Sequence, residues 1–344
     1  MSARTTQRRI ASAAIAATAS LAASVAATLP AAQAAQQGPA TALAPRLHAT
    51  ATIALGSTTN IFKNIFTQAP DRTVFFSRGS VVYVQKAALA PQIALHAGRQ
   101  VTALAANSTD LFVQTGLTVT EYNRSGGAKV RHWQLSSPRT PITIARLIAV
   151  GHTLWSQTDA GTDTTGALPA VVSRITTTSS TVHVVSRKAN YGPLAANSGG
   201  LYFDNMRTPT TEDLVHVSPA GAVHKRAARV NGLMAIGGGR LGVLFFHSGH
   251  LFLDSYSLSS LARLSSARVS NRDRDLAGTG LGLLVLNTAC SQLTCASATV
   301  SKLAFSGAVT GKLTTPRAFS LLNGPQGAVV TFSSGHMSLV RLGA

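Results

Sequence analysis

The chain has 344 residues, of which 30 are Lys or Arg and 11 are Asp or Glu, so its formal net charge is +19 at pH 7. It contains only two glutamates and seven lysines, and this scarcity of straight-chain charged residues argues against a helical fold. The composition predicts an all-β protein whose excess positive charge favours anionic partners.

The first 34 residues are predicted to form a secretory signal peptide. Arg4, Arg8 and Arg9 precede an Ala-rich apolar run, which ends before the peptidase-site sequence Ala32-Gln33-Ala34. Because the run relies on Ala rather than Leu or Ile, removal after about Ala34 is favoured over an uncleaved anchor. The two adjacent arginines leave twin-arginine export open beside the general secretory route. We therefore expect a secreted or cell-envelope protein that has no membrane span once the signal peptide is removed.

Residues 35–46 read as a flexible linker, and a repeat organises the rest of the chain. Three segments share an apolar strand, a turn with glycine and a second strand: FFSRGSVV, FFHSGHLF and TFSSGHMS. Their glycines, Gly79, Gly249 and Gly335, are 170 and 86 residues apart, close to four and two units of about 43 residues. A second motif, LAANS, occurs at 104–108 and 194–198, 90 residues apart.

Each unit reads as four short strands. Within 101–135, VTALAA, LFVQT, LTVTEY and AKVRHWQL alternate with turn sequences in the manner of a meander. The other units are predicted to start near Ile61, Ile142, Tyr191, Leu233, Asp275 and Ala318. The chain is therefore predicted to hold seven units. A total of six units is the alternative, because the first unit is compact. The last unit stops after its third strand, and we expect the alternating segment His48 to Leu55 to supply the fourth and close a ring.

A four-stranded unit of roughly 40 to 50 residues repeated around a ring is typical of a β-propeller blade. At this general level residues 47–344 resemble the secreted bacterial seven-bladed β-propellers. The resemblance implies seven four-stranded antiparallel blades. It also implies that the loops between second and third strands, and those between blades, surround the mouth of a central channel where ligands bind. No regular W-D or Y-V-T-N signature and no Asp box narrows the resemblance to a specific family.

The loops expected at this mouth hold seven of the eleven acids, beside histidines of the tight turns. Because long loops on a rigid scaffold often carry function, these residues form the candidate ligand-binding set. The set is Asp159, Asp163, Asp204, Glu212, Asp213, His247, His250, Asp273, Asp275 and His336. The alternative is an ordinary polar loop surface that nearby arginines neutralise. Without a fixed spacing, these acids cannot be assigned general acid and base roles.

The sequence predicts no metal and no cofactor. His247 and His250 could reach one cation across a turn, but no third ligand is present. The repeat also aligns His247 with Ser77 and Ser333, and His250 with Ser80 and His336, so the histidines are not a constant feature of the turn. The glycine-rich run at 237–242 matches G-x-G-x-x-G, yet a strand follows it rather than a helix. Cys290 and Cys295 are predicted to form a disulfide, as expected of neighbouring cysteines in an exported chain.

Basic residues recur on or just after the predicted fourth strands, which would form the outer rim. They are Lys129, Arg131, Arg187, Lys188, Lys225, Arg226, Arg229, Arg263, Arg268, Lys312, Arg317 and Arg99. Such a rim attracts anionic wall polymers, and its charge also protects the edge strands. Nucleic acid is not favoured, because the rim has few aromatic residues on which bases could stack.

We therefore expect a monomeric binding or scaffold module at the cell envelope, directed toward an anionic polymer, a glycan or a protein partner. The alternative is an enzyme, a lyase or hydrolase that uses carboxylates and histidines at the channel mouth. A purely structural envelope protein is the third hypothesis. No nucleophile-elbow, P-loop or zinc-protease motif supports the enzyme.

Overall fold

The computed structural model describes residues 46–58, 64–86, 89–136, 144–159, 162–163, 166–167, 169–189, 194–208, 211–228, 232–288, 297–325 and 327–343. The predicted signal peptide and both cysteines lie outside these ranges, and the ranges all belong to one compact unit, Leu43–Ala344. Every regular element within them is a β-strand, which confirms the all-β prediction. No helix in these ranges is long and apolar enough to cross a membrane.

Four antiparallel sheets consist of four strands that follow one another in the chain. The first two are β2(Phe66–Gln68), β3(Val74–Arg78), β4(Val81–Gln85), β5(Gln92–His96), and β6(Ala103–Ala106), β7(Asp110–Thr115), β8(Thr118–Asn123), β9(Lys129–Gln134). The other two are β20(Gly232–Gly237), β21(Arg240–His247), β22(His250–Ser257), β23(Arg263–Arg268), and β24(Asp273–Thr279), β25(Gly282–Asn287), β26(Ser297–Leu303), β27(Val309–Pro316). Each is a meander of the kind that the 101–135 pattern predicted.

A larger sheet joins two more four-strand groups. These are β10(Ile144–Val150), β11(Thr153–Asp159), β14(Ala170–Thr176), β15(Val182–Ala189), and β16(Ala195–Asn197), β17(Gly200–Thr208), β18(Thr211–Val217), β19(Val223–Ala227). Only one residue pair, Ala189 with Asn205, connects the two groups. The short strands β12(Thr162–Asp163) and β13(Gly166–Ala167) form a separate hairpin in the long connection from β11 to β14.

The last sheet combines the beginning and the end of the described chain. It contains β28(Ala318–Leu322), β29(Ala328–Ser333), β30(His336–Gly343) and β1(His48–Ser57). The antiparallel pairing of β1 with β30 runs from His48 opposite Gly343 to Ser57 opposite His336. The segment that lacked a partner in the sequence therefore provides the fourth strand of this sheet.

The repeated glycine turns adopt the backbone conformation that glycine alone takes without strain. Gly79, Gly249 and Gly335 have φ values of +60°, +79° and +82°. Ser248 and Ser334 precede two of them and also have positive φ, at +47° and +49°. Two consecutive residues with positive φ form the type I′ turn of a two-residue hairpin. The HSGH sequence is therefore a hairpin tip, and the two histidines are the residues that flank it.

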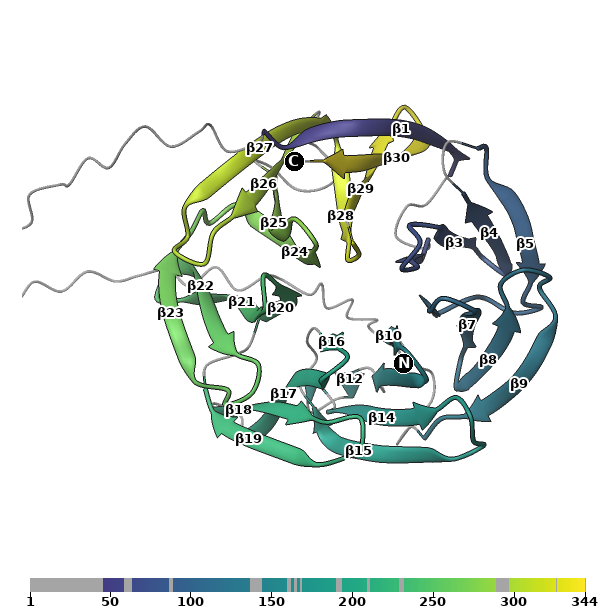
Figure 1. Ribbon diagram of the computed structural model, residues 1–344, viewed down its shortest axis with the longest axis horizontal. Helices are drawn as coiled ribbons and strands as arrows, with labels where there is room; N and C mark the ends of the chain where they lie inside the picture. Colours follow the sequence, from purple (N-terminus) through teal and green to yellow (C-terminus); the bar gives the residue numbers. More distant parts are fainter. Residues whose placement is uncertain are drawn as a thin grey trace, which may run out of the picture. The chain divides into compact units, whose positions relative to one another are not determined.

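Consecutive sheets lie side by side (Figure 1). The hydrophobic core lies in layers between them. One layer packs Phe75 and Val82 of the first sheet against Leu104 and Leu111 of the next. Another packs Leu339 of the last sheet against the first sheet, through Val74 and Phe76. Burial of a large apolar side chain contributes roughly 1.5–3 kcal/mol, so these layers are the main source of stability.

Hydrogen bonds from side chains reinforce four of these layers in the same way. In each, a side chain of one group donates to a carbonyl in the turn between the third and fourth strands of the next group. The pairs are Trp133 Nε1 to Ser179 O at 2.9 Å, Arg174 Nη1 to Pro219 O at 2.7 Å, Tyr202 Oη to Leu258 O at 2.9 Å and Ser265 Oγ to Phe305 O at 3.0 Å. Burial raises the pKa of the Tyr202 phenol, which keeps it a donor.

Candidate functional site

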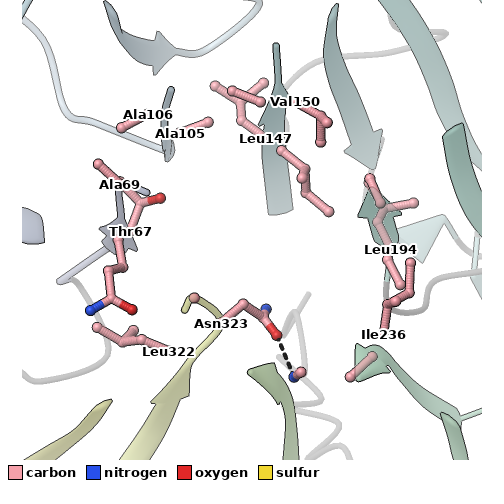
Figure 2. A pocket seen from close by; sticks show the side chains of 18 of the residues that line it. Thr67, Ala69, Ala105, Ala106, Leu147, Val150, Leu194, Ile236, Leu322 and Asn323 are labelled. Atoms are coloured by element: carbon pink, nitrogen blue, oxygen red, sulfur yellow. Dashed lines mark hydrogen bonds between the residues drawn. The ribbon is translucent and has the colours of Figure 1, made fainter. Parts of the chain in front are cut away.

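A cavity of about 580 Å³ lies where the first strands of all the four-strand groups converge (Figure 2). Side chains from these strands form its wall, among them Thr67, Ala105, Leu147, Leu194, Ile236 and Leu322. The described lining contains no Asp, Glu, His, Lys or Arg. A charged ligand would lose its hydration there without gaining an opposite charge, so the wall suits neutral molecules or water.

A loop of the last sheet forms one end of the cavity. Asn323 Oδ1 accepts a hydrogen bond from the Gly278 N–H at 2.8 Å, which Figure 2 shows as a dashed line. The Gly280 N–H donates to Pro325 O at 2.9 Å. A Cβ on Gly278 would lie 1.9 Å from Ile236 O, so the three segments meet at a distance that only glycine permits. This end of the cavity is therefore closely packed.

One buried polar side-chain atom of the described cavity wall has no hydrogen-bond partner. It is the buried Oε1 of Gln68 on β2, and a Cβ on Gly324 would lie 2.0 Å from it. An unsatisfied buried oxygen is usually paired with water or a ligand group. Gln68 is therefore a side chain through which the wall could fix the orientation of a neutral occupant.

None of the ten predicted ligand-binding residues lines this cavity. The cavity follows the ends of the first strands and the turns after them, as at Ala106, Val150 and Thr279. The predicted residues lie near the starts of first strands or near the connections between second and third strands. Because neighbouring strands are antiparallel, these two sets of segments occupy opposite ends of the sheets.

Three predicted acids lie on two adjacent strands of one group. Asp204 and Asp213 are buried on β17 and β18, where Asp213 faces Asn205 and Glu212 faces Met206 across the sheet. Two further acids belong to the neighbouring group, Asp159 at the end of β11 and Asp163 in β12. The side chains of those two lie outside the described part of the chain.

The predicted histidines occupy two hairpin tips. His247 and His250 face each other across the β21–β22 turn, and His247 is exposed. His336 is exposed at the start of β30, opposite Ser57 and Ser333. Within the described ranges, no group of three or more His, Cys, Asp or Glu residues could hold a metal ion. Ligand binding by these histidines stays a prediction.

Asp273 and Asp275 make defined contacts at the start of β24. Asp273 Oδ1 accepts a hydrogen bond from Asn287 Nδ2 at 3.0 Å. The Asp275 carboxylate accepts from the backbone N–H groups of Leu276 and Leu321, at 2.9 and 2.8 Å. Burial raises the pKa of Asp275 to about 6, although these two hydrogen bonds and the positive charge of Arg146 act in the opposite direction. Asp275 thus joins β24 to the next sheet.

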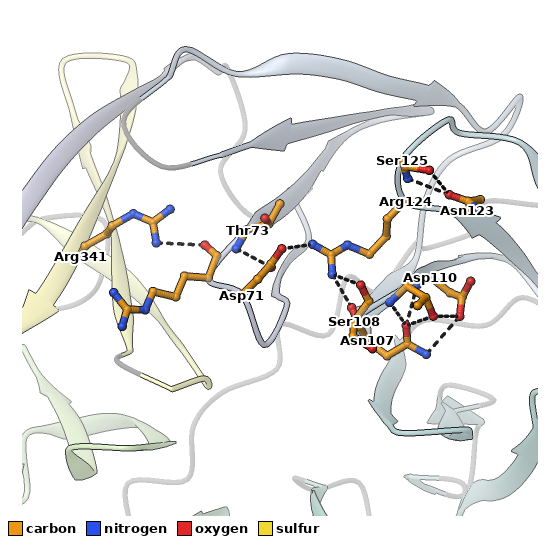
Figure 3. Close-up of polar contacts among 11 residues, drawn as sticks. Asp71, Thr73, Asn107, Ser108, Asp110, Asn123, Arg124, Ser125 and Arg341 are labelled. Atoms are coloured by element: carbon orange, nitrogen blue, oxygen red, sulfur yellow. Dashed lines mark hydrogen bonds and ion pairs between the residues drawn. The ribbon is translucent and has the colours of Figure 1, made fainter.

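A polar network lies at the same end of the sheets as the cavity, opposite the predicted acids (Figure 3). Its residues were not among the ten predicted ligand-binding residues. Arg124 Nη2 contacts Asp71 Oδ2 at 2.6 Å, and its Nη1 donates to the carbonyls of Asn107 and Ser108 at 2.6 and 2.9 Å. Partial burial opposes ionisation of Asp71, but the bonds from Arg124 and from the Thr73 N–H outweigh it and lower the pKa of the carboxyl. The network ties the first sheet to the second.

Charge is unevenly distributed between the fourth strands and the rest of the chain. The outer strands, β1, β5, β9, β15, β19, β23 and β27, together carry nine Lys or Arg residues and five His but no Asp or Glu. These nine residues are Lys129, Arg131, Arg187, Lys188, Lys225, Arg226, Arg263, Arg268 and Lys312. The sequence placed all nine correctly on fourth strands, and Arg229 lies outside the described ranges.

Two of the outer-strand arginines pair with buried acids of the adjacent third strands. Arg131 Nε lies 3.0 Å from Glu121 Oε2, and Arg263 Nη1 lies 3.5 Å from Asp254 Oδ2. Burial raises the pKa of Glu121 above its ordinary value, although the positive charge of Arg131 acts in the opposite direction. Burial and the adjacent Asp254 raise the pKa of the Tyr256 hydroxyl, which donates to that carboxylate at 3.2 Å. The acids are thus below the surface, and the exposed outer edge is basic.

Comparison with known proteins identifies the fold. No protein-family model and no curated protein matches the sequence. The β-propeller domain of Myceliophteria thermophila Cps50 (Swd1) is similar, with a TM-score of 0.58 and 12% identity over 84% of this chain and 98% of that one. The fold is a β-propeller. Its four-strand groups are therefore blades.

Two further solved structures resemble the chain to a similar degree. Kuenenia stuttgartiensis hydrazine synthase gives a TM-score of 0.57 and 12% identity, over 80% of this chain and 94% of that one. Kluyvelomyces marxianus Hsv2 gives 0.50 and 9%, over 80% and 96%. At such low identity the similarity shows the fold alone, so function has to be argued from the surfaces and the cavity.

The LAANS motif, which marks the register of the repeat, is also the one sequence signal for the cavity. Both copies of the LAANS motif place Leu-Ala-Ala on a cavity-lining segment, at 104–106 and 194–196. Small residues at the ends of first strands leave space at the centre, whereas bulky ones would fill it. The cavity escaped prediction because its apolar wall reads like any buried strand.

Proposed function

We propose that the chain is an exported β-propeller of seven blades, closed by the pairing of β1 with β30, that binds anionic polymers of the cell envelope through its outer strands. The blade count is supported by the seven first strands that line the cavity and by the seven core layers between blades. Closure is supported by the β1–β30 register and by the packing of Leu339 against Phe76.

The observation that carries the binding proposal is the absence of acids from the outer strands. A surface with nine Lys or Arg residues and no carboxylate produces a positive potential around the edge of the propeller. An anionic polymer can follow such an edge and contact several blades at once, which gains affinity through multiple weak contacts. Screening by salt should weaken the interaction, because the charges are exposed.

Binding of a purified teichoic acid tests the proposal, measured between about 0.05 and 0.5 M NaCl. The triple variant Lys129→Gln, Lys188→Gln and Arg268→Gln removes three outer-strand charges. The matched control, Lys86→Gln, Arg272→Gln and Lys302→Gln, removes three charges from outside the outer strands. We expect the first variant to bind several-fold more weakly and with a smaller salt dependence than the control. Equal losses in the two variants would show that only net charge matters and would remove the outer strands as the site.

Export and cell-envelope location remain part of the proposal through the predicted signal peptide. Fractionation of cells that express the full chain, with and without residues 1–34, tests this part separately. The lyase or hydrolase hypothesis stays a prediction, since the described contacts of Asp273 and Asp275 are with backbone and amide groups of the propeller itself.

A further inference from the structure

β19 differs from every other outer strand in the regularity of its pairing. The pairings of β1, β5, β9, β15, β23 and β27 with their neighbours each contain a register shift or bulge. The pairing of β19 with β18 contains none, from Asp213 opposite Ala227 to Val217 opposite Val223. Bulges and irregularities on an edge strand prevent another strand from pairing with it. β19 lacks this protection.

The free edge of β19 can be assigned residue by residue. The Ser218 N–H donates to Ala222 O at 2.9 Å and the Ala228 N–H donates to Glu212 O at 3.3 Å, which marks both pairs as hydrogen-bonded. Hydrogen-bonded and non-hydrogen-bonded pairs alternate along an antiparallel ladder. The backbone groups that point away from β18 are therefore those of Val223, Lys225 and Ala227. All five residues of β19 are exposed, so these groups face solvent.

Contacts with neighbouring side chains hold β19 in place. Arg174 of the preceding blade donates to Pro219 O in the β18–β19 turn at 2.7 Å. The His224 ring stacks on His216 with ring centroids 5.9 Å apart, and His216 in turn stacks on Tyr202 at 4.6 Å. A preformed edge costs less entropy to bind than a flexible one. These contacts therefore hold β19 in its extended conformation as a preformed edge.

We infer that β19 is a docking edge for an extended acidic segment of a partner protein, which adds to the blade as a fifth strand. The strand carries His224, Lys225 and Arg226 and no acid, so an added strand with Glu or Asp forms favourable cross-strand pairs. A second copy of the chain is disfavoured, because its own β19 would place like charges opposite one another. The inference does not depend on polymer binding, which concerns all the outer strands.

A pair of peptides tests whether backbone pairing, rather than charge alone, drives the binding. The probe is a fluorescent peptide with the sequence Thr-Glu-Val-Glu-Val-Glu-Thr, and its control has the same sequence with alternate backbone nitrogens methylated. Both carry the same charge, but only the first can add as a strand. We expect the methylated peptide to bind at least about tenfold more weakly by fluorescence anisotropy. Equal binding would overturn the inference, because ionic attraction would then account for it.

Amide hydrogen exchange on the full chain gives a second readout that needs no variant. Addition of the probe peptide should slow exchange at the outward-facing residues Val223, Lys225 and Ala227. Exchange at His224 and Arg226 should not change, because their N–H groups already pair with β18. Uniform protection along β19, or protection at another outer strand, would contradict the assignment.

A matched pair of substitutions separates the edge from the charge. Lys225→Ala and Lys225→Pro remove the same charge, but only proline also removes the outward N–H, and it leaves the pairing with β18 intact. We expect Lys225→Pro to bind the probe at least about tenfold more weakly than Lys225→Ala, with equal teichoic acid binding. Equal peptide binding by the two variants would refute the strand addition while leaving the polymer proposal untouched. Thermal unfolding of both variants checks that the fold is retained.

Discussion

The N–H of Leu321 donates to the carboxylate of Asp275 at 2.8 Å and so joins the first strands of two consecutive blades. Asp275 also accepts from its own neighbour, the Leu276 N–H. This acid was expected to serve a ligand at the channel mouth. In the structure it holds two blades together. Because its pKa is raised in the folded protein, the free energy of unfolding should depend on pH.

Burial raises the pKa of Asp275 from 3.8 to about 6 in the folded protein. The folded chain therefore binds this proton more tightly than the unfolded chain, and the associated stability is lost as the pH rises from about 4 through about 6. The shift corresponds to about 3 kcal/mol. Urea unfolding at a series of pH values should show this decline in the native protein and a flatter profile in Asp275→Asn.

The opposite sign is expected of Asp71, whose folded pKa is lowered. Its contribution should be present at neutral pH and should be lost as the pH falls through the folded pKa. Asp71→Asn therefore serves as the control in the same urea series. Identical pH profiles for the native protein and Asp275→Asn would contradict the raised pKa of Asp275 in the folded protein.

Gly278→Ala should destabilise the protein by about 3 kcal/mol, because the new methyl group would collide with Ile236 O at 1.9 Å. Gly126→Ala is the matched control, since no atom lies within 4 Å of its Cβ position. Chemical denaturation measures both variants. A small effect at Gly278 would mean that the packing at the end of the cavity can relax.

Arg124 and Asp71 should contribute unequally to stability although they form one ion pair. Asp71 is largely exposed, so Asp71→Ala should cost less than about 1 kcal/mol. Arg124 is mostly buried and also donates to two backbone carbonyls, so Arg124→Ala should cost about 2–3 kcal/mol. Denaturation of the two single variants measures the difference. Equal costs would show that the ion pair, and not the carbonyl contacts, dominates.

Deletion of residues 47–57 should abolish cooperative unfolding. The deletion removes β1, exposes the edge of β30 and uncovers apolar residues such as Met337 and Leu339, which pack against Ile53 and Leu55 of β1. Thermal unfolding by circular dichroism measures the effect. Deletion of residues 1–34 is the control and should leave the transition unchanged, and an unchanged transition in both would contradict the proposed closure.

The arrangement of strands could be predicted because it depends on local patterns. Gly79, Gly249 and Gly335 marked one hairpin tip in three blades, and their spacing gave the repeat. The predicted starts near Leu233 and Ala318 lie within one residue of β20 and β28. The first blade was placed less well, since it was expected near Ile61 but its first strand starts at Phe66. Short strands such as β2 leave little alternation to detect.

The candidate site was harder to predict because it depends on which ends of the strands lie together. Polar residues in long connections were favoured over the apolar ends of first strands, and that preference missed the cavity. Buried acids such as Asp254 cannot be distinguished from exposed ones by their spacing. The predicted disulfide of Cys290 and Cys295 lies outside the described residues, as does the signal peptide.

The pairing of β1 with β30 also dictates an order of events during folding. β1 is the first described strand to be synthesised, yet its partner is the last, so this contact spans almost the whole sequence. Contacts of such high sequence separation form slowly, because a long loop must close before they contribute any stability. The final blade can therefore assemble only after β30 has been synthesised, and until then the backbone groups of β1 that pair with β30 have no strand partner.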